Sequence, residues 1–568
     1  MCGIFGGVGI GVEEAHLCLQ AIRRGDDGIT VCRYDDVVLG SRRHMVKESH
    51  KAGVPEGQSD QPYLSADRKT RLVFNGELFN FAELRDDLKK EGFAFQTDGD
   101  TEVFLKLYEH QGKDFLKHPT MDAMFAFGIY DECKKELIVS RDWPGRLPLF
   151  YYYNPEKRVF IFSSELKGFR PLGWVPLADP VELVPGHCIV LNLETFTMQV
   201  TPYYQPKPCK KALPLWEVGT ELHHLMKDSA RNRTMGDVPI CTMLSGGIDS
   251  LMTTYYVLSS IDFKKVSYKP TSYVFAIDDY ISEDVRRARI AALGFKEIGL
   301  ELREVRVPKE QVVEDIGDIV DMFETRKIKA LSVYPLPIYY YLGPQMHKDG
   351  FKVTIGGHGV DELLGAYDTW KELKAPHQTQ IQPRSRLLFM NSIYENMLRR
   401  ASIIFMNRGP IEARFPFLNP RVCEYALGID PKWLSLDAAN AELMLKLIDD
   451  KAGPRSAWTR ELSGIYDYLV RYLDTGGNHP EGADEHEIIE MEKLFWKFPL
   501  IIAGMHAVEE SYLPFHCLFF PKLRGQHGSG LTSLEPLIIQ RYAHLGSTDQ
   551  EIFKSFMKTA YALDGDGI

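Results

Sequence analysis

The sequence lacks the features of membrane-spanning and exported proteins. It has no run of about 18 apolar residues, the length that a transmembrane helix requires. Its first residues, Met-Cys-Gly-Ile-Phe-Gly, also lack the basic start and the long apolar stretch of a signal peptide. We therefore expect a cytoplasmic protein with no membrane partner.

The sequence also lacks closely spaced cysteine pairs and an excess of positive charge. Its nine cysteines are an odd number, lie far apart and include no C-x-x-C pair. This pattern is typical of reduced thiols and argues against a disulfide framework or a zinc site. A net charge of -11 argues against a broad surface for nonspecific nucleic-acid binding.

The length and composition predict a globular protein of two domains. A chain of 568 residues is too long for one hydrophobic core, so we expect domains of about 200 and 350 residues. A hydrophobic content of 44% and a charged content of 26% are typical of folded globular proteins. Neither a fibre nor a disordered tail is indicated.

A glycine-rich turn at residues 244–250, Leu-Ser-Gly-Gly-Ile-Asp-Ser, predicts a phosphate site. An apolar run precedes this turn and a helical pattern follows it, so a buried strand, a turn and a helix come in succession. Glycines let backbone N–H groups approach phosphate oxygens, which the positive end of the helix also attracts. The turn has neither the spacing of the dinucleotide fingerprint nor the lysine of the Walker loop. Taken alone, the stretch could also be an ordinary Ser/Gly turn.

Cys2 directly follows the initiator methionine, whose removal a small second residue generally permits. Removal would leave a thiol and a free α-amine on one residue, and an amine of pKa about 8 can act as the base for that thiol. Chance alone could also explain an isolated Met-Cys start. Further signatures follow in order: Arg-Gly-Asp-Asp-Gly (24–28), Asn-Gly-Glu-Leu-Phe-Asn (75–80), Asp-Gly-Asp-Thr-Glu (98–102), Met-Phe-Ala-Phe (124–127), Ser-Arg-Asp (140–142), Gly-Arg-Leu-Pro-Leu-Phe-Tyr (145–151) and Ser-Ser-Glu-Leu (163–166).

This series resembles the class II glutamine amidotransferase domain over residues 2–205. The resemblance implies an N-terminal-nucleophile fold, in which two antiparallel sheets pack between helices (αββα). It also implies that Cys2 attacks the side-chain amide of glutamine and forms a thioester. The oxyanion donors would then be the side chain of Asn75 and the backbone N–H of Gly76. Asp26 stands where the family usually has proline.

The same resemblance assigns the residues that hold glutamine. Arg43 matches the arginine that grips the substrate carboxylate, and its neighbour Arg42 differs from it by only one position. Asp100 matches the carboxylate that receives the substrate ammonium. Asn75 and Glu77 are also assigned to the glutamine site.

A proline-rich stretch separates this domain from the rest of the chain. Three prolines at 202–208 predict an extended segment, and we place a linker at 206–214 and a second domain at 215–568. In the second domain strands alternate with helices. This predicts a doubly wound parallel sheet that binds nucleotide at the carboxyl ends of its strands, followed by a helical C-terminal part.

The turn at 244–250 resembles the loop of the ATP pyrophosphatases, which split ATP between its α and β phosphates to adenylate a carboxylate. A second glycine-rich turn at 355–367 resembles Ser-Gly-x-Gly-x-Asp-Glu-x-x-Gly-Gly-Tyr of the same family. The resemblance implies ATP as substrate and Mg²⁺ held by Asp249 and Asp361, because magnesium prefers hard oxygen ligands. The residues assigned to ATP are Leu244, Ser245, Gly246, Gly247, Asp249, Ser250, Val274 and Gly357.

Across both domains the chain resembles the family of glutamine-hydrolysing asparagine synthetases. The resemblance implies that ammonia released at Cys2 crosses to an acyl-adenylate at the second site, and it favours a homodimer. Three departures concern the acceptor site. Residues 327–332 replace a Thr-Thr-Ile-Arg stretch that lines the aspartate site of the family, and the family's lysine after an Ala-Trp-Arg segment has no aligned match. Arg460 is the nearest cation at that place, although arginine and lysine are not equivalent.

His358 is the third departure, because asparagine synthetases carry an acidic residue at its position. A neutral histidine can accept a proton from an attacking amine, so we assign His358 as a candidate catalytic base. A loop histidine that only forms hydrogen bonds is the alternative. Together with Lys327, Lys329 and Arg460, His358 defines the expected acceptor pocket.

The predicted function is a glutamine-dependent amidotransferase that adenylates a carboxylate other than aspartate and converts it to an amide. The acceptor would be a carboxylate-bearing small molecule or nucleotide. A divergent asparagine synthetase is the second reading of the sequence. A synthetase-derived protein that binds nucleotide without catalysis is the third.

Overall fold

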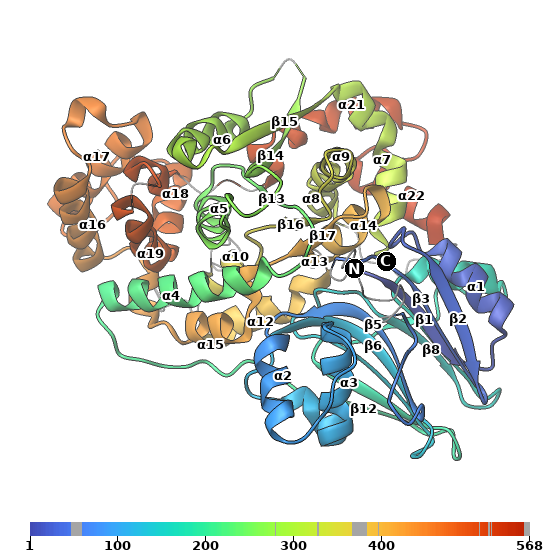
Figure 1. The fold of residues 1–568 in the computed structure, drawn as a ribbon. Helices are drawn as coiled ribbons and strands as arrows, with labels where there is room; N and C mark the ends of the chain where they lie inside the picture. Colours follow the sequence, from blue (N-terminus) through green and yellow to red (C-terminus); the bar gives the residue numbers. More distant parts are fainter. Residues whose placement is uncertain are drawn as a thin grey trace.

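The computed structural model describes residues 1–46, 60–278, 280–325, 329–365, 383–395, 397–510, 512–520, 523 and 525–561. The first part of the chain forms two antiparallel sheets, and the later part surrounds a parallel sheet (Figure 1). The predicted fold class is therefore confirmed. Figure 1 also shows that the N-terminus lies at the junction of the two parts.

The antiparallel sheets have six strands each, in the orders β10-β8-β9-β1-β3-β2 and β12-β11-β7-β6-β5-β4. A core that includes Ile4, Leu39, Val73 and Phe162 lies between them. The strands are β1 (Gly3–Val8), β2 (Ile29–Tyr34), β3 (Val37–Arg42), β4 (Tyr63–Leu64), β5 (Thr70–Leu78), β6 (Ala123–Asp131), β7 (Glu136–Arg141), β8 (Phe150–Asn154), β9 (Val159–Ser163), β10 (Val181–Glu182), β11 (His187–Asn192) and β12 (Met198–Pro202).

Helices cover the outer faces of both sheets and complete the αββα sandwich. Helix α1 (Val12–Ala21) packs on β1 and β3, and helices α2 (Phe81–Lys90) and α3 (Asp100–Gln111) lie on the β5 side of the other sheet. Every residue of β6 is buried, because one face of that strand meets the opposite sheet and the other meets helices. This explains why β6 reads as a continuous apolar run rather than as an alternating pattern.

The parallel sheet has the order β15-β14-β13-β16-β17. Its strands are β13 (Ile240–Met243), β14 (Thr271–Ile277), β15 (Glu301–Val307), β16 (Val353–Ile355) and β17 (Glu412–Arg414). Strand β13 pairs with β14 on one side and β16 on the other, so the strand order reverses there. Loops that leave such a switch point on opposite sides open a crevice, which is where open α/β sheets bind ligands.

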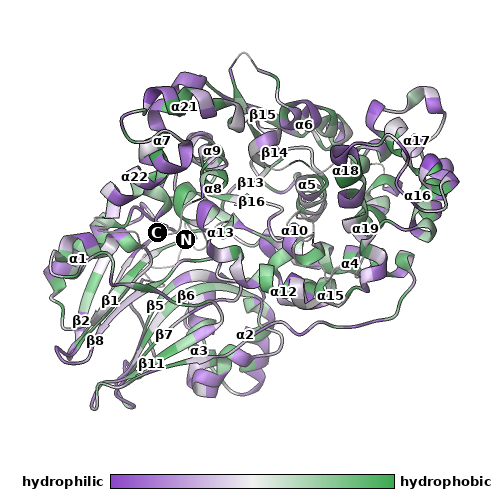
Figure 2. Cartoon of the chain, turned by 180° about the vertical axis from the view of Figure 1, so that it is seen from behind, coloured by the Kyte–Doolittle hydropathy of each residue, from purple (hydrophilic) through white to green (hydrophobic). Residues whose placement is uncertain are grey.

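Helices surround this sheet and form the C-terminal part. Helix α19 packs on α4, and Figure 2 shows α19 hydrophobic over most of its length. No helix among the described residues combines the length and the apolar character needed to cross a bilayer. The helices are α4 (Leu215–Arg233), α5 (Ile248–Ser260), α6 (Glu283–Gly294), α7 (Lys309–Phe323), α8 (Ala330–Val333), α9 (Leu336–Lys348), α10 (Val360–Leu364), α12 (Pro383–Ser392), α13 (Met397–Arg399), α14 (Phe405–Arg408), α15 (Pro420–Gly428), α16 (Ala438–Lys451), α17 (Arg460–Asp474), α18 (Glu485–Trp496), α19 (Phe498–Glu509), α20 (Gly525–Gly528), α21 (Glu535–Arg541) and α22 (Asp549–Tyr561).

The segment between β12 and α4 contains the predicted linker and has no regular secondary structure. It is nevertheless attached to α15. The backbone N–H of Cys209 donates to the carbonyl of Glu424 at 2.8 Å, and the Tyr204 hydroxyl donates to the Glu424 carboxylate at 3.0 Å. These bonds hold the connection against the second domain.

A buried ion pair joins the two domains. Asp122, at the start of β6, receives both terminal nitrogens of Arg233 from the end of α4, and the Nη2–Oδ1 distance is 2.7 Å. The Arg233 guanidinium also lies 4.3 Å from the ring centroid of Phe79. Both partners are buried, so removal of one would leave an uncompensated charge at the interface.

We expect Asp122→Ala to lower the free energy of unfolding by about 3–5 kcal/mol, the usual cost of leaving one partner of a buried pair unpaired. Urea unfolding followed by tryptophan fluorescence measures the change in midpoint. Asp114→Ala, which removes an exposed pair with Lys117, is the control and should change the midpoint little. A midpoint of Asp122→Ala equal to that of the unchanged protein would show that the pair does not hold the domains together.

Candidate active sites

A pocket in the N-terminal domain surrounds Cys2, which directly precedes β1. The sequence-predicted residues Cys2, Arg43, Gly76, Glu77 and Asp100 line this pocket. They come from the start of β1, the end of β3, strand β5 and the N-terminus of α3, which the fold brings together. The other lining residues are His44, Met45, Val46, Gln61, Phe74, Gly99 and Thr101.

Asn75 and Gly76 lie beside each other near the end of β5. Asn75 is fully buried, and neither its amide nitrogen nor its amide oxygen has a hydrogen-bond partner among the described residues. Such an amide is rare in a core because an unpaired buried polar group is costly. Gly76 is restricted by packing, since a Cβ there would lie 2.2 Å from the carbonyl oxygen of Met124. Asn75 itself does not line the pocket, but its unpaired amide directly precedes Gly76, which does.

The two candidate arginines separate in the structure. The Arg42 guanidinium donates to the backbone carbonyls of Gly25 and Ile22, each at 2.8 Å, and so serves the fold. Arg43 lines the pocket, with one nitrogen 3.4 Å from the Asp60 carboxylate. Of the two, Arg43 is the one that can reach a substrate carboxylate.

Two carboxylates face the same pocket in different surroundings. Asp100 accepts the backbone N–H of Leu78 at 2.9 Å at the first turn of α3. Glu77 is buried, and burial together with Glu412 and Asp100 raises its pKa well above the usual range. The Arg414 guanidinium of β17 lies 3.8 Å from Glu77, so the second domain contributes a charge to the edge of this pocket.

The N-terminus is enclosed where the domains meet. Met1 is buried, and its ammonium donates to the Glu412 carboxylate at 2.8 Å. In this form of the chain the nitrogen of Cys2 is part of a peptide bond. The backbone N–H of His44 donates to the Cys2 sulfur at 3.5 Å.

A second and larger pocket lies at the carboxyl ends of β13 and β16. Its lining includes every residue assigned to ATP except Gly246, and it also includes Asp361 and His358. The turn after β13 and the turn after β16 touch, because a Cβ on Gly357 would lie 2.7 Å from the backbone oxygen of Asp249. The predicted glycines thus allow the two loops to share one site.

Gly246 does not line this pocket, contrary to its assignment as a nucleotide contact. Its φ is +77°, which favours glycine, and a Cβ there would lie 2.4 Å from the backbone of Arg287. The residue shapes the turn and packs it against α6, which leaves Ser245 and Gly247 to face the pocket.

Lys497 lies between the two predicted magnesium ligands. Its ammonium contacts both carboxylate oxygens of Asp249, at 2.6 and 2.5 Å, and Oδ1 of Asp361 at 2.7 Å. Lys497 is buried at the junction of α18 and α19. The two carboxylates therefore converge on one cation, which is the arrangement that a divalent ion shared with phosphate requires.

His358 also lines this pocket and is fixed by an aromatic cluster. Its Nε2 lies 2.7 Å from the hydroxyl of Tyr339 on α9, and its ring meets Phe415 edge-on at a centroid distance of 4.8 Å. Burial raises the pKa of the Tyr339 phenol, so this hydroxyl stays protonated at neutral pH. The histidine is thus held in one orientation.

Two of the cations that we predicted beside His358 in the acceptor pocket do not lie there. Lys329 and Arg460 are exposed and neither lines the pocket, because Lys329 precedes α8 and Arg460 begins α17 on the surface. Lys327 lies outside the described residues. Among those that are described, the pocket cations are Arg287, Lys493 and Lys497.

The sequence reading missed Lys497 and Tyr339. Lys497 is the one charged residue in an otherwise apolar stretch, 494–503. Because lysine is rarely buried without a partner, a single lysine in such a stretch could have indicated a buried, paired cation. Tyr339 belongs to a run of tyrosines at 339–341 in which nothing marks one member. Apart from Ile338, Tyr339 and Leu342 of α9, the apolar lining includes Met397, Leu518 and Phe520.

Two family models match the chain in this order. One described as "Glutamine amidotransferase domain" matches residues 1–185, and one described as "Asparagine synthase" matches residues 221–387. The glutamine-hydrolyzing asparagine synthetase B of Escherichia coli (strain K12) is 26% identical over 448 residues, which cover 76% of this chain and 76% of that protein.

A second curated relative and a solved structure are also similar to parts of this chain. A glutamine-hydrolyzing asparagine synthetase of Zea mays is 27% identical over 474 residues, covering 80% of this chain and 75% of that protein. A solved structure of glutamine phosphoribosylpyrophosphate amidotransferase from B. subtilis covers 54% of this chain and 81% of its own, with 18% identity and a TM-score of 0.30.

Proposed function

Because this chain belongs to the asparagine synthetase-like family of glutamine-hydrolysing enzymes, we propose that it makes an amide from glutamine and an ATP-activated carboxylate. Cys2 would release ammonia from glutamine, and the second pocket would form the acyl-adenylate that captures it, with AMP and pyrophosphate as products. The observation that carries the proposal is the presence of both sites in one chain: Cys2, Gly76 and Asp100 in one pocket, and Asp249 with Asp361 in the other.

The first pocket supports thiol chemistry on an amide. After loss of Met1, the α-amine of Cys2 would take the thiol proton while sulfur attacks the glutamine carbonyl. The Asn75 side chain and the Gly76 N–H would stabilise the oxyanion, a contribution of about 3–4 kcal/mol for one donor in other enzymes. Arg43 would hold the substrate carboxylate, and Asp100 and Glu77 would lie at its ammonium end.

The second pocket supports the activation of an acid by ATP. The turn 244–250 would receive phosphate at the N-terminus of α5. Asp249 and Asp361 fit Mg²⁺, because both carboxylates already face one cation position. The ion would neutralise charge on the departing pyrophosphate. Lys497 would then be free to contact phosphate.

Strand β17 contacts residues at both pockets. The Arg414 guanidinium lies 3.8 Å from Glu77 of the glutamine pocket, and the Arg414 carbonyl accepts the N–H of Gly356 in the second turn at 3.0 Å. The passage of ammonia along β17 would therefore cross few residues. This supports transfer inside the protein rather than release to solvent.

The acceptor that we propose is a carboxylate with an apolar or aromatic body, not aspartate. Helix α9 contributes Ile338, Tyr339 and Leu342 to the described lining, and Met397 adds a further apolar surface. Aspartate would need partners for a second carboxylate and an ammonium, and the charged residues of the described lining, Asp284, Arg287, Glu362 and Lys493, do not belong to this apolar wall. A divergent asparagine synthetase remains the second candidate, favoured by the names of the relatives.

Pyrophosphate release across a panel of carboxylic acids tests the proposal. The full-length protein is incubated with Mg·ATP and glutamine, and pyrophosphate, AMP and glutamate are measured with each acid. We expect an aryl or alkyl carboxylate to stimulate release at least tenfold more than aspartate. Aspartate as the best acceptor would establish the second candidate, and ATP binding without AMP from any acid would indicate a protein that binds nucleotide without catalysis. Intact mass also shows whether Met1 is absent.

His358 is proposed as the base for the capture of ammonia. In the tautomer that donates Nε2–H to Tyr339, the lone pair lies on Nδ1. We expect His358→Ala to lower amide formation about 10²-fold, the usual contribution of a general base, while acid-dependent ATP–pyrophosphate exchange changes less than threefold. Tyr339→Phe keeps the ring and should give an intermediate loss. Full amide formation by His358→Ala would exclude the base role.

A further inference from the structure

His44 is buried against the nucleophile in a way that the proposed chemistry does not yet use. Its side chain has no exposed surface, and its backbone N–H is the group that donates to the Cys2 sulfur. Neither ring nitrogen has a hydrogen-bond partner within the usual distance among the described residues. A neutral imidazole always has one nitrogen with a lone pair, so His44 holds an unused acceptor beside Cys2.

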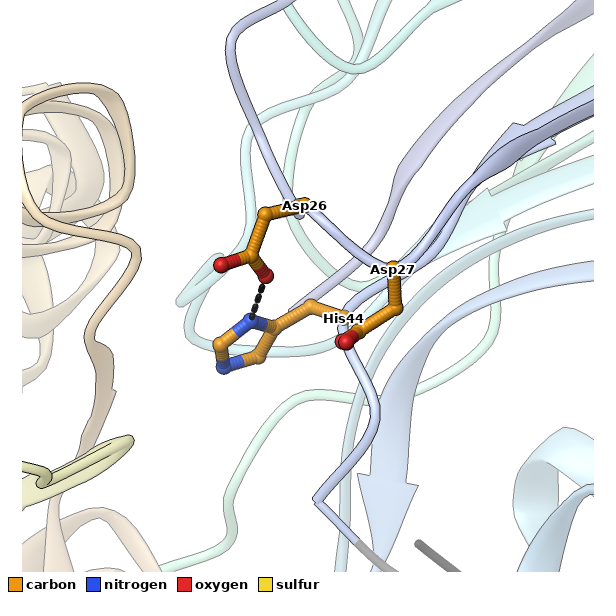
Figure 3. A group of neighbouring side chains, drawn as sticks. All are labelled: Asp26, Asp27 and His44. Atoms are coloured by element: carbon orange, nitrogen blue, oxygen red, sulfur yellow. Dashed lines mark ion pairs between the residues drawn. The ribbon is translucent and has the colours of Figure 1, made fainter.

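Asp26 determines which nitrogen carries the proton. Its carboxylate lies 3.7 Å from Nδ1 of His44, and Figure 3 shows one ring nitrogen directed at Asp26 while the other points away. At this distance the contact is electrostatic, and it favours the tautomer with hydrogen on Nδ1. The lone pair then lies on Nε2. Asp26 itself is partly exposed, with 44% of its side chain accessible.

Burial, more than the charges around it, keeps His44 neutral. The groups that face it are Asp26 and Asp27 from the 24–28 turn, the N-terminal ammonium, Glu412 from β17 and Lys352. Burial, and after it the N-terminal ammonium, lowers the pKa of His44 to about 4. The contact with His44 lowers the pKa of Asp26 to about 2. At neutral pH the pair is therefore a carboxylate and an uncharged imidazole.

Asp26, Asp27 and His44 also lie close enough together to share a metal ion. Asp27 is already engaged, however: its carboxylate oxygens are each 3.3 Å from the Lys352 ammonium, and one accepts the Met45 N–H at 2.7 Å. A divalent ion there would face a lysine charge at short range. We therefore interpret the cluster in Figure 3 as a carboxylate–imidazole pair and not as a metal site.

We propose that Asp26 and His44 are positioning residues for the N-terminal amine of Cys2, an inference that rests on the proposed function. Nε2 of His44 accepts one N–H of the amine, so that the amine lone pair faces the Cys2 sulfur. The amine takes the thiol proton as the S–C bond forms. It then gives that proton to the amide nitrogen, which leaves as ammonia. His44 stays neutral throughout.

The N-terminal position supports this assignment. The Met1 ammonium binds Glu412, and both groups act on the charge of His44, while the Cys2 sulfur accepts the backbone N–H of His44. The amine of Cys2, after loss of Met1, would begin between these two points. An acceptor is useful there, because an amine that rotates freely spends little time with its lone pair on the thiol.

Two substitutions of His44 distinguish a role in positioning the Cys2 amine from a role in filling space. Glutamine at 44 carries a polar atom near the Nε2 position, whereas asparagine reaches only the Nδ1 position. We expect His44→Asn to lower kcat for glutamate release about tenfold or more with KM for glutamine within twofold, and His44→Gln to keep at least a third of kcat. Asp26→Ala, at a partly exposed position, should show a smaller loss of kcat.

The pH dependence of Cys2 alkylation by iodoacetamide, followed by mass spectrometry, is the second measurement. We expect the apparent pKa of alkylation to shift in His44→Asn and to return toward the original value in His44→Gln. Equal loss in both variants, a change in KM alone, or a bound metal ion that the unchanged protein holds and His44→Asn loses would overturn the proposal. If the unchanged protein releases no glutamate, the proposed function fails, yet the alkylation profiles still test the His44 pair.

Discussion

Replacement of Cys2 by alanine is expected to abolish glutamine-driven product formation and to leave ammonia-driven formation within about twofold of the original rate. The nucleophile and its amine base lie on this one residue, so no neighbouring group replaces the sulfur. Loss of a catalytic nucleophile lowers rates by about 10³-fold or more in comparable enzymes. The second pocket lies in the other domain and keeps all its lining residues.

Cys133→Ala is the matched control, because Cys133 is an exposed thiol that does not line the glutamine pocket. It should retain both activities. Amide formation is measured with glutamine and separately with ammonium chloride as the nitrogen source. Equal loss of both activities in Cys2→Ala would contradict the two-site scheme, since the thiol would then contribute to acid activation or to folding.

Local sequence was sufficient to predict the parts of each site that one stretch of chain encodes. The turn 244–250 contains its own glycines, the pocket-lining serines Ser245 and Ser250, and Asp249, and the strand before it is buried. The turn after β16 repeats this organisation with Gly357 and Asp361. Only the conformational role of Gly246 could not be separated from a contact role, because a glycine that faces ligand and one that packs on α6 look alike in sequence.

Residues that reach a site from far along the chain could not be predicted in the same way. Lys497 meets Asp249 across a separation of 248 residues, and no local pattern specifies such a contact. Arg460 is the nearest cation in the sequence to the place of the family's lysine, but it begins a helix on the surface. Among the tyrosines at 339–341, only the fold decides that Tyr339 meets His358 while Tyr341 pairs with Asp315 at 2.7 Å.

Lys497→Met is expected to reduce acid-dependent ATP–pyrophosphate exchange by about 10²–10³-fold, because the charge that stabilises developing phosphate negative charge is lost. Methionine keeps most of the side-chain volume, so packing between α18 and α19 is preserved. Glutamate release at Cys2 should change little. Lys497→Arg should also be impaired, since a planar fork does not reproduce a compact point charge between two carboxylates.

The same substitution tests whether Asp249 and Asp361 hold a metal. Without the ammonium the two carboxylates repel each other in a buried site, and we expect Lys497→Met to unfold at a lower temperature. Added Mg²⁺ without nucleotide should restore much of this loss. The unchanged protein, whose carboxylates already have a cation, should respond less. Lys451→Met, which removes an exposed pair with Glu509, is the control. An equal response to Mg²⁺ in all three proteins would mean that the ion binds elsewhere, and Lys497 would then be a structural partner of Asp249 and Asp361 rather than the occupant of their cation position.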